Sequence, residues 1–308
     1  MIICFDIGGS AIKIGHAYAA EHVRPIGRVP TPGRDFAAFT AVLREAIAAA
    51  GVSPARAAFS IAGIVDPDTG IARVANIPCL NGRVLQRDLT LALGLPVDLA
   101  NDADCFALAE AVVGAGRGHD TVLGLILGTG VGGGVVVRGR LLDGPGGFAG
   151  ELGHGPVTQR VVGDPPVTLP AFPCGCGQSG CLDAVCGARG IEMLHRNLHP
   201  GASADSHAII AGWQAGAARE SRTVAIWLEI LSGPLAVAQN LLGAGIIVAG
   251  GGLSNSRPLI EALDREVRSR VLCRVERPLI VRAECAIEPG LVGAAILGLR
   301  ETREAISA

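Results

Sequence analysis

Four side chains of the kinds that bind zinc lie close together in the sequence. His154 ends the run Glu151-Leu152-Gly153-His154, and Cys174, Cys176 and Cys181 follow it. Three thiolates and one imidazole complete a closed tetrahedral zinc site, which leaves no position for a reacting water. Incidental cysteines in a reduced loop, or two disulfides, are the alternatives. The chain has nine cysteines, and its first residues lack the basic region of a secretory signal. This favours reduced thiols over disulfides, so we predict a structural zinc site.

Three glycine turns each follow an apolar run. They lie at residues 6–10 (Asp-Ile-Gly-Gly-Ser), 128–134 and 250–252. Successive glycine amides can cradle phosphate oxygens, although a plain tight hairpin would explain any single turn. A Walker loop is excluded because no Gly-Lys-Ser/Thr follows, and a dinucleotide fingerprint because the first two turns lead into a strand. Asp6 at a strand end can hold Mg²⁺. The turns therefore predict a nucleoside triphosphate site built from Asp6, Gly8, Gly9, Ser10, Gly128, Thr129, Gly130, Gly250, Gly251 and Gly252.

Polar side chains suited to a sugar lie at two further places. Asn101 and Asp102 precede a predicted helix, whose N-terminus favours a charged carboxylate. An ionised Asp102 can accept the proton of a hydroxyl that attacks phosphorus, although an ordinary helix cap is the simpler interpretation of the local pattern. Glu151 and His154 are three residues apart, on one face of a helical turn. Their acceptors and donors suit vicinal hydroxyls.

The surrounding elements follow a repeated plan. Residues 2–18 and 121–137 both read as strand, glycine turn and strand, which suggests two related domains. Helical spacing or capping predicts helices over residues 35–50, 103–113, 183–198, 221–242, 258–271 and 289–303. Strands that alternate with helices indicate an α/β fold. We predict a small domain over 1–118, joined by 289–308, and a larger domain with the zinc site over 119–288.

Composition excludes several classes of protein. The formal net charge of −2 provides no field for nucleic acid or an anionic membrane. Two long uncharged runs, 121–137 and 241–256, contain glycine clusters and fall short of the ~20 apolar residues that span a bilayer. We therefore expect a cytoplasmic protein without nucleic-acid or membrane partners. A homodimer is expected on base rates.

These motifs together resemble the ROK family of sugar kinases over nearly the whole chain. The specific signature is Glu-Leu-Gly-His at 151–154, followed by Cys-x-Cys-Gly-x-x-Gly-Cys at 174–181. Residues 101–108, 123–134 and 174–178 look most like members that phosphorylate N-acetyl-D-glucosamine. Residues 80–83 with Asp88-Leu89 resemble fructokinase-type members equally well.

The resemblance implies a two-domain actin/hexokinase-like (ribonuclease H-like) fold with a cleft between the domains. It implies ATP, Mg²⁺ and structural zinc as cofactors, and Asp102 as the general base on the sugar 6-hydroxyl. The sugar would be held by Asn76, Asn101, Asp102, Glu151, His154 and Asp183. His154 could serve both zinc and sugar because its ring has two nitrogens.

The chain departs from the family pattern at three places. The usual Gly-Gly-Thr-Lys is Gly8-Gly9-Ser10-Ala11, and Lys13, the one lysine that the chain contains, lies two positions on and on the same face of the strand. We therefore place Lys13 at the phosphates. Asp183 replaces a glutamate, and Ala62 replaces the proline of a Pro-Gly pair. These changes leave the preferred hexose open.

Three alternatives are compatible with the sequence to different degrees. A fructokinase, glucokinase or mannokinase of the same family would keep the chemistry and change the sugar. A sugar-responsive repressor would need a DNA-binding domain ahead of Asp6, for which there is no room. A non-catalytic sugar-binding or regulatory protein is argued against by Asp102 and the three glycine turns.

Overall fold

The chain divides into two compact units. The computed structural model describes residues 1–51, 53–142, 144–156 and 159–307. Unit 1 comprises Met1–Arg117, Gly139–Ala149 and Cys285–Ala308, and unit 2 comprises Gly118–Arg138 and Gly150–Glu284. Residues 139–149, which we expected in the second domain, thus belong to unit 1.

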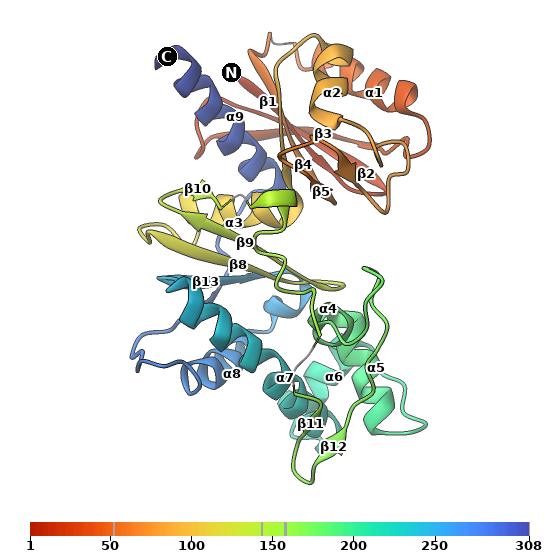
Figure 1. Ribbon diagram of the computed structural model, residues 1–308, viewed down its shortest axis with the longest axis vertical. Helices are drawn as coiled ribbons and strands as arrows, with labels where there is room; N and C mark the ends of the chain where they lie inside the picture. Colours follow the sequence, from red (N-terminus) through yellow and green to blue (C-terminus); the bar gives the residue numbers. More distant parts are fainter. Residues whose placement is uncertain (52, 143, 157–158, 308) are drawn as a thin grey trace. The chain divides into compact units, whose positions relative to one another are not determined.

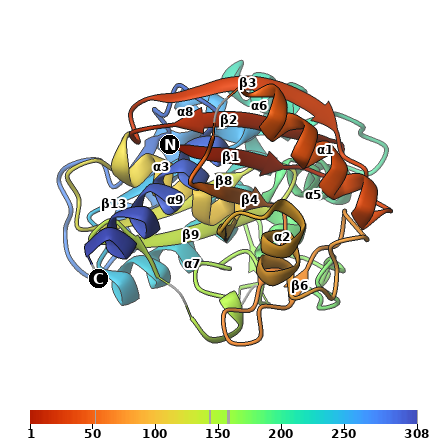
Figure 2. The same cartoon turned by 90° about the horizontal axis from the view of Figure 1, so that it is seen from above.

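Unit 1 is built on a five-stranded sheet. Its order is β3-β2-β1-β4-β7, with β1 antiparallel to β2 and parallel to β4. The strands are β1 (Ile2–Ile7), β2 (Ala11–Ala17), β3 (Val23–Pro30), β4 (Arg56–Ile61) and β7 (Val97–Asn101). Figure 2 shows β3, β2, β1 and β4 following one another across the sheet. The apolar run of β1 is buried because this central strand is covered on both faces.

Helices cover the two faces of this sheet. Side chains of α1 (Phe36–Ala49) and α2 (Leu85–Leu93) join the core on one face, where the rings of Phe5 and Phe59 stack with centroids 4.9 Å apart. α3 (Asp102–Val112) and α9 (Pro289–Ser307) pack together and against the strands (Figure 1). The unit also contains β5 (Ile64–Val65), β6 (Ala72–Arg73), β10 (Arg140–Leu141) and the short 3₁₀ helix Pro145–Gly147.

Unit 2 repeats the strand plan of unit 1. β8 (Thr121–Leu127) is antiparallel to β9 (Val131–Val137) and parallel to β13 (Ile246–Gly250), which is parallel to β14 (Ile280–Arg282). The antiparallel hairpin followed by two parallel strands matches β1, β2, β4 and β7. The predicted pair of related strand–turn–strand units is thus confirmed.

Five helices of unit 2 pack on one hydrophobic core. They are α4 (Leu182–Cys186), α5 (Ala188–Leu198), α6 (Ser206–Gln214), α7 (Ala218–Leu242) and α8 (Arg257–Arg268). A small hairpin, β11 (Val161–Val162) and β12 (Val167–Thr168), and the 3₁₀ helix Gly252–Asn255 complete the unit. The prediction of a single helix over residues 183–198 was wrong. The helix is interrupted at Gly187, whose extended backbone packs against Thr129 and Gly130 and leaves no room for a side chain.

Helix α7 is long and apolar enough to cross a membrane by length and composition alone. Its side chains nevertheless contribute much of the core of unit 2, and Trp227, Leu231 and Leu235 are fully buried there. The indole N–H of Trp227 donates to the carbonyl of Cys186 at 3.0 Å. A buried core helix can be as long and as apolar as a spanning helix, and the packing assigns α7 to the core.

Candidate functional site

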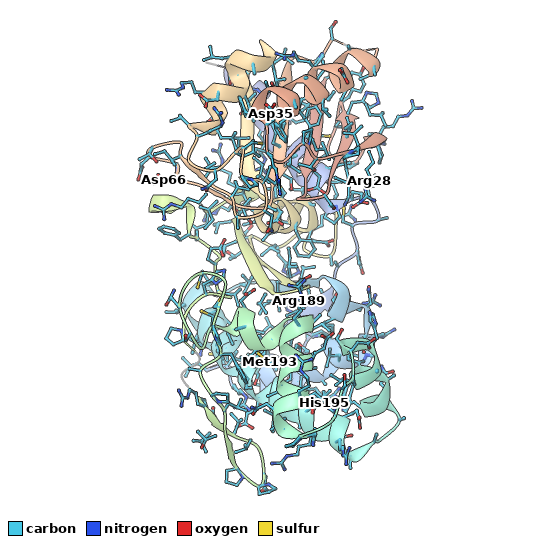
Figure 3. All side chains as sticks on the ribbon, turned by 90° about the vertical axis from the view of Figure 1, so that its right-hand side faces the viewer. Arg28, Asp35, Asp66, Arg189, Met193 and His195 are labelled. Carbon is cyan, nitrogen blue, oxygen red and sulfur yellow. The ribbon has the colours of Figure 1, made fainter. Side chains whose placement is uncertain are left out.

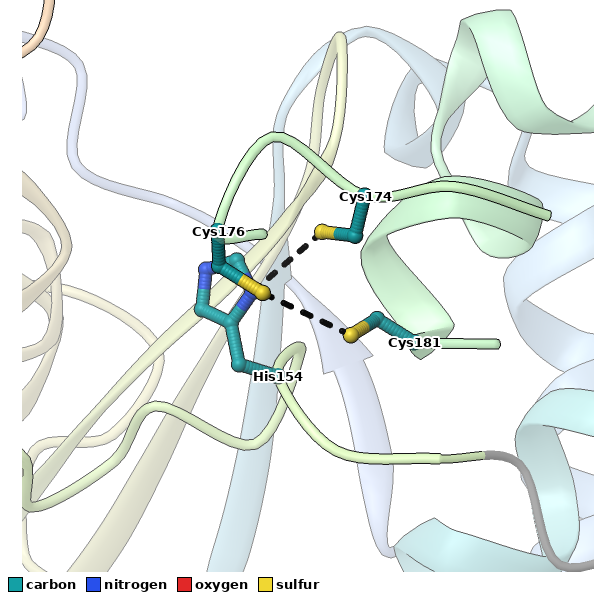
Figure 4. Close-up of side chains that lie close together, drawn as sticks. All are labelled: His154, Cys174, Cys176 and Cys181. Carbon is teal, nitrogen blue, oxygen red and sulfur yellow. Dashed lines mark hydrogen bonds between the residues drawn. The ribbon is translucent and has the colours of Figure 1, made fainter. Parts of the chain in front are cut away.

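The four predicted zinc ligands converge in unit 2. Their ligand atoms all lie within 4.8 Å of one another (Figure 4). Sγ of Cys176 is 3.7 Å from Sγ of Cys181, and Sγ of Cys174 is 3.6 Å from Nδ1 of His154. Zn–S bonds of about 2.3 Å would separate the sulfurs of a tetrahedral site by roughly 3.8 Å. The donor set and its spacing therefore fit a structural zinc ion.

The cysteine loop is shaped by backbone hydrogen bonds. The N–H of Cys174 donates to the carbonyl of Gln178 at 2.8 Å, and the N–H of Gly177 donates back to the carbonyl of Cys174 at 3.0 Å. The N–H of Gln178 lowers the pKa of the Cys176 thiol to about 7, whereas burial raises the pKa of Cys174 to about 12. Metal binding would remove both protons, because thiolates are the ligating form.

Glu151 and His154 lie in one tight turn beside this loop. The N–H of His154 donates to the carbonyl of Glu151 at 3.0 Å, and Nε2 of His154 lies 3.7 Å from Oε2 of Glu151. Burial raises the pKa of Glu151, His154 opposes this shift, and the charge of Asp183 adds to it. Both side chains are thus on one side of the turn, as their spacing predicted.

The two glycine turns of unit 2 lie side by side. Gly251 has a φ of 84°, and a Cβ there would collide with the backbone of Leu127 and Gly128. Since Leu127 and Gly128 open the turn at 128–130, this close approach brings the ends of β8 and β13 together. The structure thus places all six predicted phosphate or nucleoside residues of unit 2 at one edge of its sheet.

The first glycine turn lies in unit 1 and closes the β1–β2 hairpin. The N–H of Gly8 donates to the carbonyl of Ala11 at 3.0 Å, and the Thr31 hydroxyl donates to the carbonyl of Gly8 at 2.7 Å. A Cβ added to Gly9 would lie 3.2 Å from Cβ of Asn76. Asn76, predicted to touch sugar, therefore stands directly beside the predicted phosphate turn.

Asp6 at the end of β1 is held by partners from two neighbouring strands, β4 and β2. The Ser60 hydroxyl of β4 donates to Oδ1 of Asp6 at 2.9 Å. Nζ of Lys13 lies 3.3 Å from Oδ2 of Asp6 and 2.6 Å from Oε2 of Glu288. Burial by itself would lower the pKa of Lys13, but the hydrogen bond to Glu288 and the charge of Asp6 outweigh it and raise the pKa. Lys13 thus stays cationic beside the turn.

Asn101 and Asp102 occupy the start of α3. Oδ1 of Asn101 accepts the N–H of Ala103 at 2.7 Å, and Nδ2 of Asn101 donates to the carbonyl of Gly63 at 2.9 Å. Asp102 is exposed in the first turn, and its Oδ1 accepts the N–H of Ala103 at 3.0 Å. Asn101 is therefore the helix cap, and the carboxylate of Asp102 remains accessible to solvent.

The predicted site residues fall into two groups. Unit 1 brings together Asp6, Gly8, Gly9, Ser10, Lys13 and Asn76, and it carries Asn101 and Asp102 at the end of β7. Unit 2 brings together the four predicted zinc ligands, Glu151, Asp183 and the other two glycine turns. Sequence reasoning missed Thr31, Ser60 and Glu288. For Ser60 a signal existed, because it is the polar residue within the apolar run 57–61, which is a buried strand beside β1.

The class of protein follows from these features and from similarity to known proteins. The family model described as "ROK family" matches residues 2–301, and the chain belongs to this family. A ROK hexokinase from Thermus thermophilus has the same two-sheet α/β fold, with a TM-score of 0.83, 31% identity and coverage of 98% of this chain and 99% of that one.

Two curated relatives are similar over nearly their full length. The N-acetyl-D-glucosamine kinase of Pectobacterium atrosepticum is 35% identical over 96% of this chain and 98% of its own. The N-acetylgalactosamine kinase AgaK of Shewanella sp. is 34% identical over 95% of both chains.

Proposed function

We propose that the protein is an ATP-dependent sugar kinase that phosphorylates the 6-hydroxyl of N-acetyl-D-glucosamine. The observation that carries the proposal is the exposed carboxylate of Asp102 in the first turn of α3, next to a capping Asn101 whose side chain is fixed at both ends. Membership of the ROK family and the similarity to an N-acetyl-D-glucosamine kinase support the same activity.

In the proposed reaction Asp102 acts as the general base. It accepts the proton of the 6-hydroxyl while the oxygen attacks the γ-phosphorus, and ADP leaves. Asn101 orients the same region of the sugar, and Asn76, Glu151 and His154 bind other hydroxyls. Asp183 is proposed as a further sugar residue, and its Oδ1 also accepts a hydrogen bond from the N–H of Val131.

The phosphates are assigned to the glycine turns. Backbone amides of Gly8 to Ser10 and Gly128 to Gly130 would bind them, with Lys13 adding charge and Gly250 to Gly252 lying near the nucleoside. Asp6 would hold Mg²⁺, directly or through water, and Mg²⁺ neutralises charge on the phosphates when bound. Zinc on His154, Cys174, Cys176 and Cys181 would hold the loop that carries the imidazole.

The choice of sugar is the open part of the proposal. N-acetylgalactosamine differs from N-acetylglucosamine only in the orientation of the 4-hydroxyl, and a relative of equal similarity is named for it. Glucose, mannose and fructose would suit the fructokinase or glucokinase alternative. We further propose a cytoplasmic homodimer without a nucleic-acid partner.

A coupled ADP-release assay tests the proposal directly. The protein with ATP and Mg²⁺ is given N-acetylglucosamine, N-acetylgalactosamine, N-acetylmannosamine, glucose, mannose or fructose in parallel. The expected result is the highest kcat/KM for N-acetylglucosamine. Preference for another hexose would keep the kinase and reject the sugar, whereas no sugar-dependent ADP release would support a non-catalytic sugar-binding protein.

A further inference from the structure

The side chain of Asp183 points into the second glycine turn. Its Oδ1 accepts the N–H of Val131, the residue directly after the turn, at 2.9 Å. A Cβ on Gly130 would collide with this same oxygen. The carboxylate is thus packed against the backbone of the turn at 128–130, and only glycine at position 130 allows it to come so close.

The backbone of Asp183 is fixed at the zinc cluster. Its N–H donates to the carbonyl of Gly153 at 2.9 Å, and Gly153 is adjacent to His154. Asp183 also follows the ligand Cys181 by two residues, in the first turn of α4. One residue therefore joins the backbone beside two zinc ligands to the backbone of the turn.

A second contact strengthens this connection. The N–H of Ala188, at the start of α5, donates to the carbonyl of Gly128 at 2.8 Å. Oδ2 of Asp183 lies 3.6 Å from Sγ of Cys174, but a zinc-bound thiolate has no proton to donate. The connection consequently depends on Oδ1 and Val131 and not on the sulfur contact.

We propose that Asp183 is a positioning residue that ties the glycine turn at 128–130 to the cysteine loop. The inference rests on the proposed function only in that this turn is there assigned to phosphate. Aspartate is one methylene shorter than glutamate, and this shorter side chain meets the N–H of Val131 directly. Loss of the carboxylate would free the turn and weaken nucleotide binding, with the sugar residues intact.

The experiment compares Asp183→Ala with Asp183→Asn. Alanine removes the acceptor, whereas asparagine keeps an Oδ1 that can accept the Val131 N–H. Amide hydrogen exchange over residues 128–133, and the Kd values for a non-hydrolysable ATP analogue with Mg²⁺ and for N-acetylglucosamine, are measured for both. For Asp183→Ala we expect exchange and nucleotide Kd to rise about tenfold, the change that follows from losing one hydrogen bond to a charged group. For Asp183→Asn we expect both to stay near wild type.

Asp205→Ala is the matched control. Asp205 also accepts a backbone N–H, that of Ala208 at 2.8 Å, but at the start of α6. Its loss should leave the exchange of residues 128–133 unchanged. Unchanged exchange in Asp183→Ala, or weaker sugar binding in both Asp183 variants with unchanged nucleotide Kd, would overturn the proposal. Should the alanine variant fail to fold, the sugar and nucleotide affinities of the asparagine variant still decide. If the wild-type protein binds no nucleotide, the proposed kinase activity is rejected. The exchange data would still show whether Asp183 holds the turn at 128–130.

Discussion

The catalytic argument at the scale of single residues depends on Asp102. Its neighbour Asn101 already caps α3 and bonds to Gly63. The simpler interpretation of Asp102 as a cap is therefore weakened, because the capping position belongs to the residue before it. A carboxylate that is not the principal cap, at a positive helix end, is suited to act as a base.

The first prediction concerns Asp102→Asn. Turnover should fall by about 10²–10⁴-fold, because asparagine cannot accept the hydroxyl proton, while the melting temperature and sugar Kd should change little. Steady-state kinetics and calorimetry check this. Asp68→Asn, an exposed carboxylate of the same unit, serves as the control. Near wild-type turnover of Asp102→Asn would remove the base assignment.

The second prediction concerns the displaced lysine. Lys13 is held between Asp6 and Glu288, so its charge stands beside the turn although the family position is Ala11. Lys13→Ala should raise the KM for ATP about tenfold and change the sugar KM little, the loss expected for one charged hydrogen bond. Adding Ala11→Lys to that variant should restore part of the affinity.

Arg28→Ala is the control for this lysine. Arg28 is the partner of Lys13 in the β2–β3 ladder and is exposed on β3 (Figure 3). It removes the same charge without touching Asp6. An unchanged KM for ATP in Lys13→Ala, or equal effects of the two variants, would show that Lys13 does not serve the phosphates.

At the scale of elements, the contact between α5 and α7 contains a buried histidine. His195 (Figure 3) is 1% exposed, and its Nδ1 is 2.9 Å from the Thr223 hydroxyl. Burial lowers its pKa and so does His199, Glu220 opposes them, and Arg219 lowers it further. The imidazole is therefore neutral in the folded chain at neutral pH.

The third prediction follows from the sign of this shift. Below the unfolded pKa of 6.5, the unfolded chain takes up a proton that folded His195 resists. The free energy of unfolding should therefore fall as pH drops below about 6.5, with a slope of at most about 1.4 kcal/mol per pH unit from this group. Urea titrations across this range should show a smaller slope for His195→Gln. The exposed His207→Gln should keep the wild-type slope, and an identical slope in both variants would contradict the assignment.

The fourth prediction concerns the cysteine loop. Cys176→Ser should lower zinc content, melting temperature and sugar affinity together, because the loop carrying His154 loses a ligand. Metal analysis, calorimetry and sugar titration measure these quantities. Cys273→Ser, an exposed cysteine of the same unit outside the cluster, should change none of them. Full zinc content in Cys176→Ser would exclude this ligand.

At the scale of the whole molecule, each unit has its own hydrophobic core. Both tryptophans of the chain, Trp213 and Trp227, are associated with the core of unit 2. Tryptophan emission thus reports on the unit that contains the cysteine cluster, and the cluster braces α4 at the edge of that core.

The fifth prediction uses this reporter. Removing zinc with a chelator should lower the urea midpoint of tryptophan emission, because a bound metal stabilises the folded state that holds it. Adding zinc back should restore the midpoint, and adding magnesium should not. Metal analysis must show that zinc has left, and an unchanged midpoint after its loss would mean that the cluster contributes nothing to the stability of unit 2.

The sequence by itself determined the features whose chemistry lies in local spacing. The cluster of His154 and three cysteines lies between residues 154 and 181 and follows from local spacing. The three glycine turns, the capped start of α3 and each strand–turn–strand unit likewise follow from patterns in short stretches of sequence. The prediction of one helix over 183–198 was wrong because a contact remote in sequence decided it. The glycine turn at 128–130 packs against Gly187 and interrupts the helix there.

Only the tertiary structure decided which distant residues meet. Ser60 reaches Asp6 because β4 lies beside β1, and Glu288 reaches Lys13 across 275 positions of sequence. Residues 139–149 return to unit 1, and Asp183 turns to Val131. Strand pairing and packing produce such contacts, and they depend on the path of the whole chain. No local pattern records them, which is why the cluster of His154 and three cysteines was predictable from the sequence and the partners of Asp6 and Asp183 were not.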